Sequence, residues 1–315
     1  MTTPENEPQW ERRLLEKLAL AMLQEQRVKR RWGIFFKVIG FAYLVTVLVL
    51  LVDWDGPEKL ADGQHTAVVH VSGTIESGGE ASAESINEAL RVAFGDKGTA
   101  GVVLRLNSPG GSPVQAGIIH DEIRRLRSKH PQTSLYVVVE DLCASGGYYV
   151  AVAADKIFVD KASIVGSIGV LMDGFGFTGT MDKLGVERRL LTAGVNKGFL
   201  DPFSPQDEEQ KKHARVLLGE IHQQFIDVVR QGRGARLKET PEMFSGLMWT
   251  GAQSVQLGLA DGFGTVGSVA REVIKAERIV DFTVKDNIAE RFAKRLRADA
   301  TLGSLLGVVD LPAFR

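Results

Sequence analysis

The sequence has little of what builds a disulfide framework, a metal cluster or a nucleic-acid surface. It contains one cysteine, Cys143, among 315 residues, which excludes an internal disulfide and any centre held by several cysteines. Lysine and arginine (38) nearly balance aspartate and glutamate (39), so the formal net charge is −1. Because no overall positive charge attracts a polyanion, we expect no nucleic-acid partner.

Long apolar stretches with few charges are also scarce, and the one near the N-terminus indicates a membrane-spanning segment. Residues 32–52 form an apolar run broken only by Lys37, and a helix of that length extends roughly 31 Å, enough to cross the hydrocarbon core of a bilayer. Four basic residues precede the run and three acidic residues follow it: Arg27, Lys29, Arg30, Arg31, Asp53, Asp55 and Glu58. The positive-inside rule then predicts a single-pass signal anchor at 32–52, with a charged helix in residues 1–31 on the cytoplasmic side.

Two other interpretations of this run are less favourable. A cleaved signal peptide has a shorter n-region and a small-residue cleavage site, whereas 31 residues precede the run and Val52-Asp53-Trp54 ends it. A buried core helix that is apolar on all faces is unusual beside a basic cluster.

After a polar linker at 53–63, apolar runs of strand and helix period alternate along the chain. This alternation predicts an α/β fold with a largely parallel sheet. We expect strands at 68–71, 102–106, 135–139, 157–159, 168–171 and 187–191. We expect helices at 83–94, at 146–154, from Ser112 and Pro113 to about 128, and from Ser204 and Pro205 to Gly232.

Two turns rich in small residues follow neighbouring predicted strands. Ser145 lies in the turn after 135–139, and Gly110 and Gly111 lie in the turn after 102–106. A serine hydroxyl held at such a turn, beside free backbone N–H groups, suits a nucleophile that generates an oxyanion. Because both turns come at carboxyl ends of strands, we expect them to form one site. The alternative interpretation of Gly110 and Gly111 is a tight strand–helix turn.

A serine nucleophile needs a base to accept its proton. None of the six histidines occupies a glycine-rich turn at a strand end, so a Ser–His–Asp triad has weak support. Lys197 lies in a turn of small and apolar residues, where loss of hydration favours the neutral amine that can accept a proton. Cys143 is expected to be a small buried apolar residue rather than a nucleophile.

Several blocks in order along the chain resemble one peptidase family. They are 106–111, Ala144 to Ala151, 155–158, 166–170, Lys197 in its glycine-bounded turn, 201–204, and 251–261. Over roughly residues 65–275 the sequence resembles the signal peptide peptidase A family of Ser/Lys peptidases, in its short form with one catalytic unit. The resemblance implies the ββα superhelix with parallel sheets shared by Clp protease and crotonases, here preceded by a transmembrane helix.

The resemblance also implies a role for each site residue. Ser145 attacks the peptide carbonyl, Lys197 accepts and returns the proton, and Ser167 orients the lysine. The N–H groups of Gly111 and Gly146 hold the oxyanion. No cofactor and no metal is implied.

The implied protein is a membrane-anchored serine endopeptidase that hydrolyses cleaved signal peptides and other membrane-proximal peptides. Its peptidase domain covers residues 64–275 and a C-terminal extension covers 276–315. The expected partners are peptide substrates, the lipid bilayer and further copies in a homo-oligomeric ring. The catalytic domain is expected outside the cytoplasm, which is the periplasm in a Gram-negative host.

Three other functions remain open at this point. A membrane Ser/Lys protease that works with stomatin-like proteins has the same dyad. A crotonase-like acyl-CoA enzyme uses the same oxyanion turns without a nucleophile. A catalytically idle membrane scaffold would need neither Ser145 nor Lys197.

Overall fold

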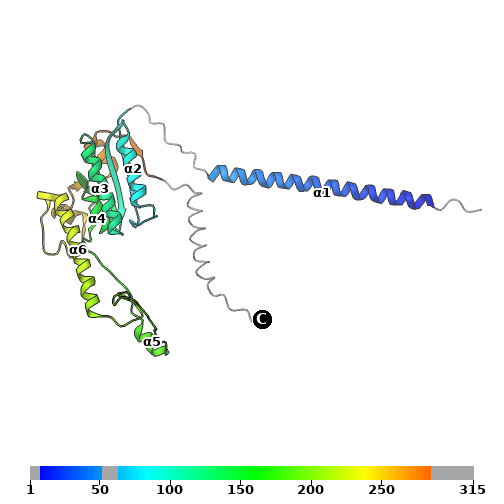
Figure 1. Ribbon diagram of the computed structural model, residues 1–315. Helices are drawn as coiled ribbons and strands as arrows, with labels where there is room; N and C mark the ends of the chain where they lie inside the picture. Colours follow the sequence, from blue (N-terminus) through cyan, green and yellow to red (C-terminus); the bar gives the residue numbers. More distant parts are fainter. Residues whose placement is uncertain (1–7, 52–62, 285–315) are drawn as a thin grey trace, which may run out of the picture. The chain divides into compact units, whose positions relative to one another are not determined.

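The computed structural model describes residues 8–51 and 63–284. The chain divides into two units, Met1–Lys59 with Asp286–Arg315 and Leu60–Lys285 (Figure 1). The first unit contains α1 (Pro8–Leu51), one continuous helix of 44 residues. Large apolar side chains of α1 are exposed from Trp32 to Val45.

Within the described residues, no helix combines the length and the apolar character needed to span a membrane. The predicted anchor at 32–52 ends outside the described residues, as does most of the linker at 53–63, and the anchor stays a prediction.

The second unit is built on a sheet whose strands are almost all parallel, as the sequence predicts. The main path runs β6-β5-β3-β2-β1-β8, with β4 beside β3 and β7 beside β4. Only the β5–β6 pair is antiparallel. The strands are β1 (His65–Ser72), β2 (Thr99–Ser108), β3 (Ser134–Ala144), β4 (Lys156–Val159), β5 (Ile164–Gly166), β6 (Met248–Thr250), β7 (Gly262–Phe263) and β8 (Ile279–Asp281).

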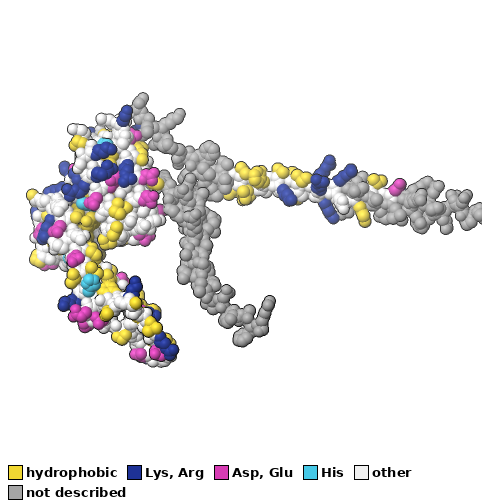
Figure 2. Space-filling view, viewed as in Figure 1, with side chains coloured by type: hydrophobic (Ala, Val, Ile, Leu, Met, Phe, Trp, Pro, Cys, Tyr) yellow, Lys and Arg dark blue, Asp and Glu magenta, His cyan; other side chains and the backbone are white. Residues whose placement is uncertain are grey.

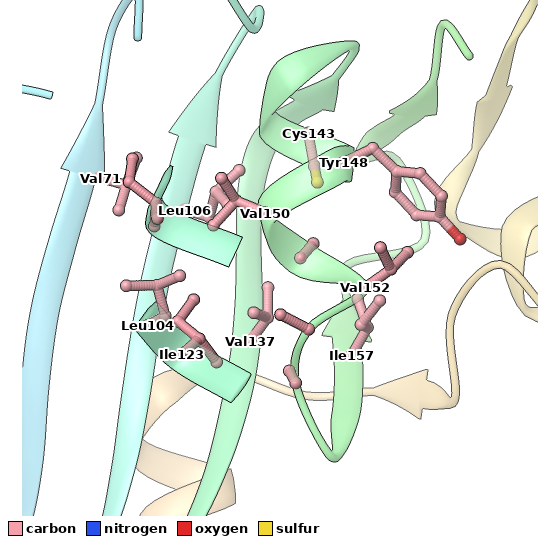
Figure 3. Close-up of a cluster of buried hydrophobic side chains, with 14 of the residues drawn as sticks. Val71, Leu104, Leu106, Ile123, Val137, Cys143, Tyr148, Val150, Val152 and Ile157 are labelled. Carbon is pink, nitrogen blue, oxygen red and sulfur yellow. The ribbon is translucent and has the colours of Figure 1, made fainter. Parts of the chain in front are cut away.

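Alternating side chains of the central strands enter two separate apolar clusters. One face of the sheet, including Val71, Leu104 and Val137, packs in the larger core. Figure 3 shows these residues beside Ile123 and Val150 of the covering helices. The other face, including Val68, Val103 and Val138, forms a smaller cluster with the C-terminal segment around Val269. Burial on both faces explains why the strands appear as uninterrupted apolar runs.

Three helices cover the larger core: α2 (Ala83–Gly95), α3 (Pro113–Lys129) and α4 (Gly146–Ala151). The predicted start of α3 is confirmed, since the Ser112 side chain caps the helix at the N–H of Gln115 and Pro113 occupies the first turn. α4 ends three residues earlier than predicted. Cys143 is fully buried, as predicted, and burial raises the pKa of its thiol far above the ordinary value.

β3 pairs with two different strands along its length, which opens space at its carboxyl end. Tyr136–Val138 pair with β4, whereas Leu142–Ala144 pair with β5. The strand predicted at 168–171 is wrong, because the chain turns away from the sheet after β5 and Ser167 donates its N–H to Leu247 O. The edge strand here is β6.

Residues 171–207, called the arm below, extend from the body of the domain and carry α5 (Thr178–Leu184) (Figure 1). The strand predicted at 187–191 is wrong, because these residues are exposed and pair with no strand of the described chain. The long helix α6 (Glu208–Arg233) returns the chain to the body. Its N-cap is Asp207 rather than Ser204, and Gly234 rather than Gly232 ends it.

The remaining elements close the domain: η1 (Gly234–Arg236), α7 (Gly251–Gln256), α8 (Val266–Ser268) and a π-helical turn, η2 (Val269–Ile274). Arg233 is 1% exposed and forms an ion pair with Asp261 at 2.8 Å. Burial opposes ionisation of Asp261, but the hydrogen bonds from Arg233 and the Ile157 N–H lower its pKa overall. β8 pairs with β1, so the sheet extends past residue 275 into the predicted C-terminal extension.

Candidate active site

Ser145 occupies a sharp turn between β3 and α4. Its φ of 53° and ψ of −124° are uncommon for a residue with a side chain. Two backbone hydrogen bonds hold it, from Ser145 N–H to Gly166 O (2.9 Å) and from Tyr149 N–H to Ser145 O (3.0 Å). Such a conformation costs about 1–3 kcal/mol and persists only where the surroundings impose it, as at functional sites.

The glycine turn after β2 lies directly against Ser145. Gly110 has a φ of 100°, and a Cβ there would come within 2.6 Å of Gly146 N and 2.7 Å of Ser145 Cβ. Gly111 has a φ of 146°, and its Cβ would lie 2.2 Å from Ile75 O. Only glycine fits either position. The turn therefore does more than connect a strand to a helix, because it brings a second segment of backbone beside the serine.

Two backbone donors lie together at this contact. A Cβ on Gly146 would be 3.3 Å from Gly111 N, so the two residues are neighbours. Among the backbone hydrogen bonds of the described loops and turns, none uses the N–H of Gly111 or Gly146. Two unpaired N–H groups beside a serine hydroxyl are suited to an oxyanion, and each such donor is worth roughly 3 kcal/mol of barrier.

These groups open into a pocket of about 560 Å³. Its walls come from α3, α4, α6 and the loop before β6, and most of its side chains are apolar. The lining residues are Gly111, Pro113, Ala116, Ser145, Gly146, Tyr149, Ser167, Gly169, Val170, Leu171, Ile221, Gln224, Phe225, Ser245 and Gly246. A chain of apolar side chains suits this cavity better than a charged ligand.

Ser167 lies in the same pocket, on the segment that follows β5. Its φ of 51° is also unusual for a residue with a side chain, and its N–H donates to Leu247 O at 2.8 Å. The structure thus brings together four of the five predicted site residues: Gly111, Ser145, Gly146 and Ser167.

Lys197 is the predicted site residue that does not line this pocket. It lies exposed in the arm, close to Val195, which is 95% exposed. Within a single chain the structure therefore does not bring the lysine to the serine, and the Ser145–Lys197 dyad stays a prediction.

No histidine lines the pocket of Ser145 either. His120 is buried beside Tyr149, and its pKa is lowered by burial, although the hydrogen bond with Asp121 opposes this shift. His222 Nε2 lies 3.2 Å from Ile168 O, a backbone contact next to Ser167. These positions agree with the weak support for a histidine base.

Several lining residues give no signal of a site in the sequence. Ile221 and Phe225 belong to the apolar stripe of α6, which predicts only that the helix packs on something. Tyr149 follows the serine by one helical turn, and its ring packs on Phe225 at 5.2 Å between centroids. Gly246 adopts a φ of 88°. A glycine at this position could indicate a special turn in the sequence. Its place beside the Ser167 segment depends on the hydrogen bond between Ser167 and Leu247, which are far apart in the chain.

The sheet is parallel α/β, and at its carboxyl edge a strained serine lies beside two free N–H groups. These features place the protein in the class of α/β proteins with a serine-nucleophile site. The family model of peptidase family S49 matches residues 127–280. A signal peptide peptidase SppA of Enterococcus faecium, named as putative, is 30% identical over 235 residues, which cover 72% of this chain and 68% of that protein. The chain belongs to the signal peptide peptidase A family, peptidase family S49.

Other relatives are longer than this chain. Protease 4 of Haemophilus influenzae is 31% identical over 261 residues, 79% of this chain and 40% of that protein. A Brucella melitensis protein named Na(+)/H(+) antiporter NhaA is 45% identical over 210 residues, 65% of this chain. The chain spans only 28% of the length of that antiporter-named relative.

Among solved structures, a mutant of ClpP1 from Listeria monocytogenes is similar over 62% of this chain and 90% of that chain, with 15% identity and a TM-score of 0.39. So low a score establishes neither the superhelix nor an assembly. The parallel α/β sheet is confirmed, and the Clp protease/crotonase superhelix stays a prediction.

Proposed function

We propose that the chain is a serine endopeptidase in which Ser145 is the nucleophile and Lys197 the base. Ser145 Oγ attacks the peptide carbonyl carbon while its proton passes to the neutral Lys197 amine. The carbonyl oxygen becomes an oxyanion between the N–H groups of Gly111 and Gly146. The proton then goes to the leaving amine, the C–N bond breaks, and water hydrolyses the acyl-enzyme in a second, similar cycle.

One observation carries this proposal: the strained Ser145 shares an apolar pocket with two unpaired backbone donors. A serine that only packs has no need of a backbone conformation with positive φ. A crotonase-like enzyme would need the donors but not the serine, and nothing in the pocket favours an acyl-CoA over a peptide.

We place the lysine of each site on a neighbouring copy of the chain. The arm that carries Lys197 exposes large apolar side chains, including Leu171 (79%), Phe175 (80%) and Leu191 (97%). Such a set on one protruding segment is typical of a surface that another protein covers. A ring in which each arm reaches the next subunit would cover these side chains and deliver Lys197 to Ser145.

For the substrate we propose the apolar segments of cleaved signal peptides and other membrane-proximal peptides. The walls formed by Val170, Ile221 and Phe225 suit the side chains of such segments. The membrane Ser/Lys protease that works with stomatin-like proteins remains an alternative, since it would use the same pocket and dyad.

We propose that residues 32–52 anchor the protein in the cytoplasmic membrane, with the catalytic domain outside the cytoplasm. The composition of the run and the basic residues before it support this placement. So does the exposure of apolar side chains all along α1 from Trp32 to Val45, because water is a poor environment for them.

A mixing experiment tests the dyad and its division between copies. Ser145→Ala and Lys197→Ala are each expected to lower kcat/KM on an apolar peptide by at least about 10³-fold. Co-expression of the two variants is expected to restore about a quarter of wild-type activity, because a site then takes its serine from one copy and its lysine from another at random.

Lys183→Ala is the matched control, since Lys183 lies in the same arm on α5, and it should retain full activity. Retained cleavage by either purified site variant would reject the dyad. Two inactive variants that stay inactive when co-expressed would show that both residues act within one copy.

A further inference from the structure

Charge is distributed unevenly between the two edges of the parallel sheet. Because β1, β2, β3, β4 and β8 run in one direction, all their amino ends lie at one edge and all their carboxyl ends at the other. The carboxyl edge holds Ser145. The amino edge is where the chain enters the domain at His65.

Basic residues occupy the start of strand after strand at the amino edge. They are Lys97 before β2, Lys129 before β3, Lys156 at the first position of β4, and Lys275 and Arg278 before β8. All five are exposed. We call this set the basic edge. At the carboxyl edge exposed acids outnumber exposed bases. Asp141 and Asp281 lie in the second halves of β3 and β8, Glu76 and Asp160 follow β1 and β4, and Lys161 is an exposed base beside Asp160.

Hydrogen bonds place the basic edge around the chain entry. His65 N–H donates to Gly98 O at 2.9 Å, and Thr66 N–H donates to Arg278 O at 2.8 Å. Lys97 and Arg278 therefore flank the point at which the segment from α1 joins the sheet. Asp155 N–H donates to Leu135 O at 2.8 Å, which puts Lys156 at the start of β3 as well.

The acids at the starts of these strands are fewer than the bases, so they offset only part of this charge. Asp155 is paired with Arg127, and Asp96 accepts the N–H of Gly98 at 2.6 Å. Glu277 is the exposed acid next to Arg278. Figure 2 shows lysine and arginine side chains gathered over the part of the domain that contains α2 and α3.

We infer that the basic edge binds the anionic phospholipid headgroups of the membrane that holds the anchor. This inference rests on the proposed anchoring, because the chain that follows the anchor enters the domain at His65, beside this edge. With a net charge of −1, the chain has no general attraction to anions, so the attraction is confined to one edge. Lysines near an anionic leaflet each strengthen association about fivefold.

The orientation that follows keeps the catalytic pocket away from the headgroups. β3 contains 11 residues, and at about 3.3 Å per residue it holds Ser145 roughly 35 Å from the basic edge. Anionic headgroups would then contact the basic edge only, while the acidic carboxyl edge faces away from them.

The test uses the full-length protein with vesicles of phosphatidylcholine alone or with added phosphatidylglycerol. Cys143 is buried, so an introduced cysteine can be labelled selectively with a fluorophore. Gln132→Cys reports on the basic edge and Ser77→Cys on the carboxyl edge, since both positions are exposed. The vesicles carry a headgroup quencher.

We expect quenching at position 132 to exceed that at 77, to rise with phosphatidylglycerol and to fall in high salt. A domain whose position 132 is quenched is docked. The double variant Lys97→Glu with Lys129→Glu should lower the ratio of docked to undocked domains at least about 25-fold. Lys161→Glu with Lys212→Glu, which changes the net charge equally away from this edge, should leave it unchanged.

The outcomes separate this inference from the anchor. In one outcome the protein binds both kinds of vesicle and shows equal quenching at position 132 with and without phosphatidylglycerol. This result rejects headgroup binding by the basic edge and retains the proposed anchor. Association only with the anionic vesicles, abolished by the lysine reversals, supports the basic edge and rejects the anchor. No association with either kind rejects both.

Discussion

Backbone conformation at single residues makes the site. Ser145 and Ser167 both adopt positive φ values, 53° and 51°, and both line one pocket. Each is held by a hydrogen bond to a segment distant in sequence, Ser145 to Gly166 and Ser167 to Leu247. Because the surroundings impose these conformations, the strain is offset by the packing of the whole domain.

Gly110 tests how closely the two turns must fit. In Gly110→Ala the new Cβ would meet Gly146 N and Ser145 Cβ, so the serine turn must move. Displacement of a nucleophile by about 1 Å costs about 10²-fold, and we expect kcat/KM to fall at least that far. Thermal unfolding should show a destabilisation of about 1–3 kcal/mol.

Gly117→Ala is the control, since Gly117 lies within α3 and a Cβ there meets nothing within 4 Å. It should stabilise the protein by about 0.5–1 kcal/mol and leave kcat/KM unchanged. Full activity of Gly110→Ala would show that the glycine turn does not position the serine.

Part of this site could be predicted because its residues lie in local turns. Ser145 and Gly111 follow strands within a few positions, and parallel strands bring such turns to one edge. Gly146 and Ser167 were expected in the site only from the resemblance to the family. Tyr149 and Phe225 were missed because a residue that lines a pocket and one that fills a core share the same helical spacing. Only the three-dimensional contact distinguishes them.

At the scale of elements, α2 and α3 are joined by a buried carboxylate. Glu122 of α3 is 8% exposed and accepts hydrogen bonds from Arg125 and from Arg91 of α2. The hydrogen bond from Arg125 is the main cause that lowers the pKa of Glu122 to about 2, against an ordinary value of 4.5. Burial opposes this shift, and the Arg91 bond adds to it.

This shift predicts a pH dependence of stability. A carboxylate whose pKa is lowered by folding stabilises the protein fully above about pH 4.5, and the contribution is lost as the pH falls toward 2. Since both arginines are more than half exposed, solvent screening reduces the gain, and we expect about 1–3 kcal/mol. Urea unfolding between pH 7 and pH 3 measures it.

Glu122→Gln should destabilise the protein at pH 7 and flatten this dependence. Glu88→Gln, at an exposed position of α2, should change neither. An equally steep loss of stability in acid for Glu122→Gln and the wild type would contradict the assignment.

The arm is the element that the sequence described least well. Residues 187–191 are Glu-Arg-Arg-Leu-Leu, and only Leu190 and Leu191 indicate the burial that a strand would provide. Within one chain these residues stay exposed, and the arm is held by local contacts such as Phe177 stacked on Phe203 at 5.3 Å. Apolar side chains predict that a surface is covered, but not whether their own chain covers it.

At the scale of the whole molecule, the proposals give each end of the domain a separate task. In these proposals the amino edge of the sheet would meet the membrane through the basic edge, and the carboxyl edge would hold the nucleophile. The arm would reach from the body to a neighbouring copy. Assembly would then complete the site, so that a free copy is inactive and proteolysis is confined to the membrane-bound ring.

The central claim is that Ser145 is a nucleophile activated by Lys197. A fluorophosphonate reacts with an activated serine, whose oxygen bonds to phosphorus as fluoride leaves, and peptide mass spectrometry locates the phosphonylated residue. We predict modification at Ser145 alone in the assembled wild-type protein, and a rate lower by about 10²–10⁴-fold in Lys197→Ala, the range that a general base contributes. Modification at another serine, or an unchanged rate at Ser145 in Lys197→Ala, would contradict it.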